Sequence, residues 1–530
     1  MAWKCPTHVH SGHGRHPALG KIRLYFLRIP TTLEFCVYFC GAIHYRRALN
    51  NGMAAIVPQA MGEFNSPFMS TRLVCLLAAG GAFFGVLFCW SPILVPVLIE
   101  VAVAIIFLFR PAAALKLTLF TAGLPLTLFY EDVGYNGGSN KPLFAEWGGT
   151  TPDGLRLLLS SLFLLIVLYR LEHTRRLLAR FWPYVILLLF LAGTLLYSTA
   201  PVDGLRLLLK IVFPFLVFLL AAQLLRSSEE ADSSVRYWIA GGIVASFCAP
   251  VLVLLVGRKF LYPDGFRYSP GFTSASSYSF YMLALFLFCY MQWRKQYSAR
   301  FAILTVLFGV QTILPITRIT WVALVVSVGT FEALHIKGAK KWASTVAVVL
   351  IPILAFYSLL WRFPALQERV FQSDRIDSDV SLIELVQNVG LTGRGTVWLS
   401  ALEDYQQHNR LLGQGIGSSD NYTMSLFGTV AHNEYLRVLY DGGAVGLSLF
   451  LFANFWLLRW LRTLKNSGQQ VVREYASLGI ALMLAYLVVA LTDNPLDYYM
   501  LFTQYVFFSL AICFALSGTM NDPAQESQAI

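Results

Sequence analysis

Long apolar runs alternate with short polar segments along most of this chain. From residue 72 onward the runs are about 17 to 20 residues long, enough for a helix to cross the hydrocarbon layer of a bilayer. The pattern predicts an all-α polytopic membrane protein with about 14 transmembrane helices. Hydropathy places them at 72–88, 92–109, 112–130, 155–169, 182–198, 205–225, 238–256, 277–292, 301–316, 321–334, 342–360, 444–460, 476–491 and 498–516.

The polar segments between these runs predict the topology and the division of the chain. Basic residues cluster in alternate loops, at 170–180, 292–300, 335–341 and 459–465, as expected if those loops and the basic N-terminus face the cytoplasm. Residues 1–71 are then a cytoplasmic or interfacial segment, and spans fill 72–360 and 442–516. The stretch 361–441 forms one large loop on the outer face, and 517–530 form a cytoplasmic tail.

Composition supports this class and argues against two others. Of the 530 residues, 57% are hydrophobic and only 13% are charged, which is unlike a soluble enzyme. The net charge of +11 comes from lysines and arginines in short loops, so it reflects topology and not a nucleic-acid surface. None of the eight cysteines falls in a predicted outward loop, so we expect no disulfides.

Three loops predicted to face outward break the charge rule, because they carry arginines next to apolar spans. Arg258 and Lys259 in the first loop are interpreted as structural, whereas Arg267, Arg318 and Arg394 are the candidates for function. An arginine at membrane depth costs a few kcal/mol on insertion scales, so Arg318, inside an apolar run, needs a partner. A guanidinium fork matches a phosphate and stays charged in any surroundings, which suits a lipid-linked diphosphate. The alternative is that each arginine extends toward the membrane surface or pairs with an acid such as Asp264.

His432 begins the second notable stretch, H-N-E-Y-L-R-V-L-Y-D-G-G-A-V-G-L at 432–447. It lies at a predicted boundary between membrane and water, directly before a Gly442–Gly443 break and a new span. A lone histidine is more often a hydrogen-bonded structural residue than a base. Its place near the three arginines makes it a candidate for proton transfer.

These stretches resemble elements of the O-antigen ligase and polysaccharide polymerase superfamily. The sequence at 432–447 is similar to the family's H-N-x-x-L motif, which a glycine-bearing turn connects to a transmembrane helix. G-R-G-T-V-W-L-S-A-L at 393–402 and L-L-G-Q-G-I-G at 411–417 resemble the element upstream of it. R-Y-S-P-G-F-T-S-A-S-S-Y at 267–278 and T-R-I-T-W-V-A-L at 317–324 resemble two earlier ones.

The resemblance implies a GT-C-like glycosyltransferase of the bacterial inner membrane with a large periplasmic loop. It would transfer a glycan from undecaprenyl diphosphate to a hydroxyl of a glycan or lipid A core acceptor, without a metal or other cofactor. Its further partners would be chain-length regulators or export proteins, and no nucleic acid. His432, Arg318 and Arg394 would be catalytic; Arg267, Asn433, Glu434 and Asp493 would contact substrate.

A carboxylate touching His432 would hold its tautomer and raise its basicity. Glu434 and Asp493 are the candidates. We favour Asp493, because it comes from a different element, the predicted outer turn T-D-N-P-L-D. An equally good interpretation makes Asp493 the N-cap of the last helix.

Three alternatives stay open at this point. A metal-dependent glycosyltransferase could use Asp377 with Asp379, or Glu131 with Asp132, as ligands. A transporter or flippase for polysaccharide or lipid-linked oligosaccharide would also place arginines among many spans. Within the resembling family, ligase and polymerase differ only in the acceptor; glycines 413, 415 and 417 are interpreted as loop residues in either case.

Overall fold

The structure is a computed structural model that describes residues 109–121, 173–225, 227–255, 274–335 and 394–517, with residues 106, 165, 168, 268 and 362. The predicted N-terminal segment 1–71 and the spans at 72–88, 92–109, 155–169 and 342–360 fall wholly or mostly outside them. Arg267 and the four candidate metal ligands, Glu131, Asp132, Asp377 and Asp379, also lie outside the described residues.

The elements in these ranges are helical, and they follow the predicted apolar runs. They are α4 (Pro111–Thr121), α6 (Thr174–Arg180), α7 (Trp182–Thr194), η3 (Leu195–Tyr197), α8 (Pro201–Leu224), α9 (Ser228–Leu255), α10 (Ala275–Gln296), α11 (Ala299–Ile313), α12 (Arg318–His335), α16 (Arg394–Gln407), α17 (Ser418–Phe427), α18 (Glu434–Lys465), α19 (Gln470–Val489), η4 (Pro495–Tyr498), η5 (Tyr499–Thr503) and α20 (Gln504–Leu516).

Four of the helical segments are long and apolar enough to cross a membrane: α8, α18, α19 and the segment Pro495–Leu516. A fifth is possible if α6 and the segment Trp182–Tyr197, which meet at a bend of 89°, are counted as one span. The class of helical membrane protein is thus supported within the described residues. The expected number of about 14 spans stays a prediction.

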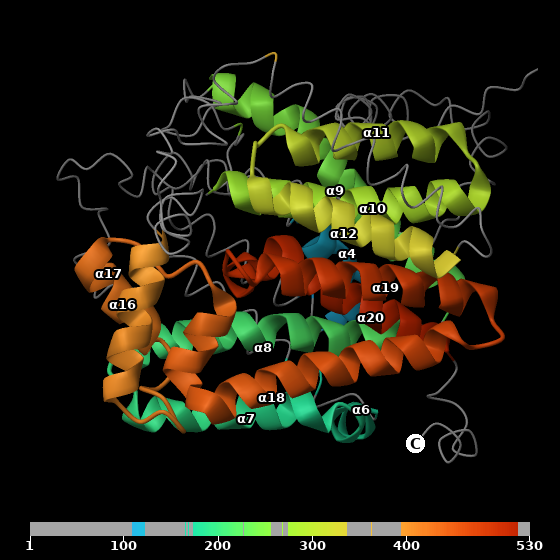
Figure 1. The fold of residues 1–530 in the computed structure, drawn as a ribbon. Coiled ribbons are helices and arrows are strands. Elements are labelled where there is room, and N and C mark those ends of the chain that lie inside the picture. Colours follow the sequence, from blue (N-terminus) through green and yellow to red (C-terminus); the bar gives the residue numbers. More distant parts are fainter. Residues whose placement is uncertain are drawn as a thin grey trace, which may run out of the picture. The chain divides into compact units, whose positions relative to one another are not determined.

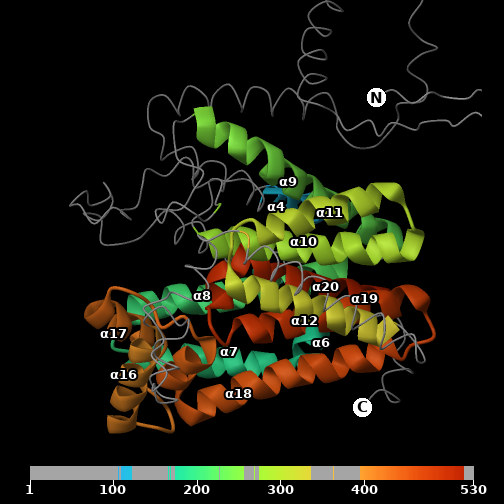
Figure 2. The same cartoon turned by 45° about the horizontal axis from the view of Figure 1, so that its top comes forward.

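Helices pack side by side in pairs, α7 with α18, α8 with α20, α12 with α19 and α10 with α11 (Figures 1 and 2). Aromatic side chains fill the space between them. The ring of Trp238 stacks on Tyr505 with 4.0 Å between centroids, and Phe288 meets Trp238 edge-on at 4.4 Å. Such pairs contribute stability beyond the apolar area that they bury.

The two ends of the bundle differ in chemistry. At one end lie the turns α10–α11 and α18–α19 and the basic helix α6, and there Lys295 pairs with Glu474 at 3.3 Å and Arg294 with Glu332 at 3.1 Å. The first turns of α8 and α18 lie at the other end with α16 and α17 (Figure 1). Predicted cytoplasmic loops therefore share one end and predicted outer loops the other, as an alternating topology requires.

The connection between α16 and α17 is held close to the helices by three glycines. Gly413, Gly415 and Gly417 have φ values of +72°, +89° and +88°, a region that side chains disfavour. A Cβ on Gly417 would lie 2.4 Å from the backbone nitrogen of Gly204 in α8, and one on Gly413 would lie 2.5 Å from the nitrogen of Gly443 in α18. They are loop glycines, as the sequence indicated, and they let backbone pack on backbone.

Candidate active site

The stretch that carries His432 turns sharply into α18. His432 has a φ of +49°, which is uncommon for a residue with a side chain. Asn433 then caps the helix, because its side-chain oxygen accepts a hydrogen bond from the backbone nitrogen of Leu436 at 3.0 Å. The expected glycine break is present, since Gly443 leaves helical geometry with φ +64° and ψ −167°. His432 is thereby placed just outside the helix and beside its N-terminus.

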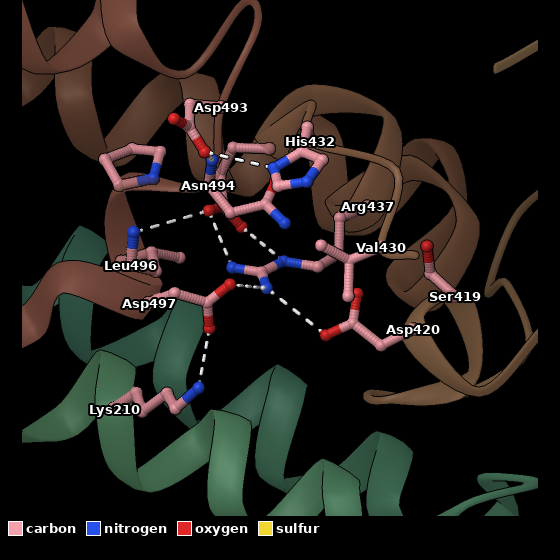
Figure 3. Close-up of polar contacts among 12 residues, drawn as sticks. Lys210, Ser419, Asp420, Val430, His432, Arg437, Asp493, Asn494, Leu496 and Asp497 are labelled. Carbon is pink, nitrogen blue, oxygen red and sulfur yellow. Dashed lines mark hydrogen bonds and ion pairs between the residues drawn. The ribbon is translucent and has the colours of Figure 1, made fainter. Parts of the chain in front are cut away.

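Asp493 contacts the imidazole of His432. Its Oδ1 lies 3.2 Å from Nδ1, and the side chains are 3% and 29% exposed, respectively (Figure 3). The same oxygen accepts hydrogen bonds from the backbone nitrogen of Asn494 at 2.9 Å and from the hydroxyl of Tyr498 at 3.2 Å. An imidazole that donates from Nδ1 to a carboxylate keeps its lone pair on Nε2, which is the form that a general base needs.

The turn that carries Asp493 lies between α19 and η4. The structure places Asn494, not Asp493, at the N-cap position of η4, and Asn494 makes no side-chain capping bond. Of the two sequence interpretations, the contact with His432 is therefore the one that the geometry supports. Glu434 does not contact the imidazole; its carboxylate is fully buried and faces Arg437.

Two side chains of helix α16 bind backbone carbonyls next to His432 and Asp493. The Nη1 of Arg394, at its first residue, donates to the backbone carbonyl of Thr492, next to Asp493. One turn later the indole nitrogen of Trp398 donates to the carbonyl of Ala431, next to His432. The structure thus places Arg394 near His432 and Asp493. These three predicted residues are much farther apart in the sequence than residues that meet on one helix face.

Arg318 begins α12 and is half-buried. Helix α12 packs along α19, and Glu332 near its far end contacts Arg294 at the opposite end of the bundle. Arg318 therefore lies at the end where α19 leads into the Asp493 turn. Its contact with a substrate stays a prediction, as do those of Asn433, Glu434 and Arg267.

Sequence reasoning missed the most heavily paired side chain of this region, Arg437. Its guanidinium is fully buried and binds Glu434 through Nε at 2.8 Å and Nη2 at 2.7 Å. Nη1 reaches Asp497 at 3.0 Å and Asp420 at 3.3 Å, and Asp497 in turn pairs with Lys210 of α8 at 2.6 Å (Figure 3). Burial raises the pKa of the Asp420 carboxyl, against the effect of Arg437, which lowers it.

A second missed residue, Asp441, fixes helix α17. Its carboxylate accepts hydrogen bonds from the backbone nitrogens of Gly417 at 2.8 Å and Ser419 at 2.7 Å. Backbone nitrogens at the start of a helix have no partner within the helix, so Asp441 supplies one. Asp441 and Asp420 thus both tie α17 to α18, the first by capping and the second through Arg437. The only sequence signal was that Asp441 is the last residue of the predicted outer loop 361–441.

The fold and this site define a helical membrane protein with a histidine–carboxylate pair at one end of its bundle. Residues 303–451 match the model of the family described as O-antigen ligase. The match confirms the resemblance of this region to the O-antigen ligase and polymerase superfamily, and it indicates a glycosyltransferase of that type. It includes Arg318, Arg394, His432 and Arg437, but not Asp493. No curated protein matches the chain.

Proposed function

We propose that the chain transfers a glycan from undecaprenyl diphosphate to a sugar hydroxyl on the periplasmic face of the bacterial inner membrane. The observation that supports this proposal best is the partly exposed His432 imidazole in contact with the buried carboxylate of Asp493. Arg394 lies beside this contact, because it donates a hydrogen bond to the backbone carbonyl of Thr492. This arrangement lies mostly inside the region that matches the O-antigen ligase family.

In this proposal Nε2 of His432 accepts the proton of the acceptor hydroxyl. The acceptor oxygen attacks the anomeric carbon of the donor glycan, and the bond from that carbon to the diphosphate oxygen breaks with its electron pair on the phosphate. Asp493 holds the imidazole in the basic tautomer and stabilises the imidazolium as it forms.

Arginines would carry the other half of the reaction. Negative charge grows on the leaving diphosphate, and fixed cations placed there stabilise the transition state more than the ground state. Arg394 and Arg318 serve this role from the start of α16 and α12, and Arg267 from the part of the sequence that precedes α10. Because these cations belong to the protein, the reaction needs no metal ion. Chain-length regulators or export proteins would act beside the enzyme and are not needed for the transfer step.

The experiment uses a deletion strain complemented with wild-type protein or with the His432→Ala variant. Loss of all O-antigen on lipid A core would identify a ligase, whereas core carrying single repeat units would identify a polymerase. If His432→Ala stays in the membrane at normal abundance and restores full polymer, the proposed chemistry is wrong. A variant that transfers glycan but no longer exports it would favour the transporter or flippase.

A further inference from the structure

The turn between α19 and η4 is attached to the start of α18 at two charged points. Asp493 contacts His432, and Asp497, four residues later, contacts Arg437, five residues after His432 (Figure 3). Backbone bonds add to this attachment, because the nitrogen of Glu434 donates to the carbonyl of Ala490 at 2.9 Å. A turn held at one point can pivot, whereas a turn held at both ends presents Asp493 in one position.

Arg437 is the centre of this attachment, and its own orientation is fixed. Glu434, one turn earlier on the same helix, binds two of its nitrogens side by side, a bidentate geometry that only a guanidinium offers. The remaining nitrogen is thereby directed at Asp497 and Asp420. The side chains of both acids are about one quarter exposed, at 25% and 24%, while that of Arg437 is 1% exposed.

Arg437 balances the charge of the carboxylates around it. Around it stand three carboxylates, and the other cation that pairs with them among the described residues is Lys210, which reaches only Asp497. Without Arg437, the buried Glu434 carboxylate would have no counter-ion within the described part of the chain. Breaking such a pair on one side is strongly destabilising, and the turn would move away to let water reach the acids.

We infer that Arg437 is a positioning residue that sets the contact between His432 and Asp493 through Asp497. The inference rests on the proposed function, in which that contact makes His432 the base. Arg437 touches neither imidazole nor substrate in this account. Its effect is on rate, since a displacement of a catalytic group by about 1 Å can lower a rate about 10²-fold.

The test compares Arg437→Lys and Asp497→Asn with Asp493→Ala in purified, reconstituted protein supplied with a lipid-linked glycan donor and its acceptor. Arg437→Lys keeps the charge but loses the fork. We expect kcat to fall about 10- to 100-fold with the donor KM within about twofold of wild type. Asp497→Asn leaves Arg437 paired with Glu434 and Asp420, so it remains informative if Arg437→Lys fails to fold. Glu332→Gln removes the charge of a buried carboxylate that pairs with the partly exposed Arg294 at the opposite end of the bundle, and it is the matched control, with unchanged kcat expected.

Two readouts separate positioning from a general loss of structure. Combining Arg437→Lys or Asp497→Asn with Asp493→Ala should lower kcat little further than Asp493→Ala alone, because both changes act through one contact. Without any substrate, diethyl pyrocarbonate should modify His432 at least about threefold faster in Asp493→Ala, Arg437→Lys and Asp497→Asn, because the ring is no longer held. Mass spectrometry of the peptide that contains His432 measures this rate.

The outcomes distinguish the inference from the proposed function. If Asp493→Ala speeds the modification of His432 while folded Arg437→Lys and Asp497→Asn do not, the inference is overturned whatever the reaction is. Multiplicative losses of kcat in the double variants would overturn it as well. Normal transfer by His432→Ala, with the modification rates as expected, would overturn the proposed function and leave Arg437 as the residue that positions the histidine–aspartate pair.

Discussion

Two replacements of Asp493 can separate the two effects of its carboxylate on His432, which are orientation of the ring and negative charge. In Asp493→Asn, the amide oxygen can occupy the place of Oδ1 and still accept from Nδ1 of His432, the nitrogen of Asn494 and the hydroxyl of Tyr498. Orientation and tautomer are then kept, and only the negative charge is lost. In Asp493→Ala all three contacts disappear, so the ring is also free to turn.

The size of the charge effect follows from the 3.2 Å contact. Coulomb's law gives an attraction to the imidazolium of about 1.3 kcal/mol at the dielectric constant of water and about 5 kcal/mol at an effective value of 20. Because the imidazole is partly exposed, we take about 2 kcal/mol, which lowers kcat about 30-fold. Asp493→Ala adds the orientational loss and should approach the full contribution of a general base, about 10³-fold, with about 2 kcal/mol less stability from buried donors left unpaired.

The assay is steady-state glycan transfer by the reconstituted variants, with thermal unfolding in the same detergent to measure stability. Equal rates for Asp493→Asn and wild type would refute the electrostatic part of the reasoning. Equal losses for Asp493→Asn and Asp493→Ala would refute the orientational part. Only a normal rate in both variants would mean that the contact between His432 and Asp493 serves structure alone.

Two further outcomes follow from the geometry. Gly417→Ala should destabilise the protein by about 3 kcal/mol or more, because its Cβ would lie 2.4 Å from the α8 backbone in a left-handed conformation. Gly428→Ala is the control, since Gly428 has a φ of +65° and a Cβ there would meet nothing within 4 Å, and it should cost only about 1 kcal/mol. Thermal unfolding measures both. Transfer should stay within about twofold of its normal rate in excess EDTA, since arginines neutralise the leaving group in this mechanism. Activity lost to EDTA and restored by Mg²⁺ would instead favour the carboxylates at 377 and 379.

Periodicity and hydropathy predicted the helices well where one apolar run makes one helix. The run predicted at 205–225 became α8 (Pro201–Leu224), and the run at 476–491 became α19 (Gln470–Val489). The span predicted to begin at 444 is the part of α18 that follows the kink at Gly443, and the helix itself begins ten residues earlier, at Glu434. Hydropathy detects only the apolar part of a helix. The polar first turns from Glu434 are helical because Asn433 caps them and because Arg437 is paired with carboxylates inside the fold.

The site was predictable as far as single residues have unusual positions. His432 stood out because a titrating group lay at a boundary, and Asp493 because it came from another outer turn. Arg437 did not stand out, because an arginine three residues after a glutamate looks like a common surface pair. Its other partners, Asp420 and Asp497, are 17 and 60 residues away, and only the packing of α17 and η4 on α18 brings them together.

The central claim is that His432 is the base of a glycan transfer, and the most direct measurement is in vitro transfer by His432→Ala from a lipid-linked diphosphate donor. His408→Ala is the matched control, because that histidine lies 3.5 Å from an aspartate on α16 and is 44% exposed. We expect that His432→Ala, folded and inserted, loses transfer by at least about 10²-fold while His408→Ala keeps it. Transfer by His432→Ala at a rate close to that of His408→Ala would contradict the account.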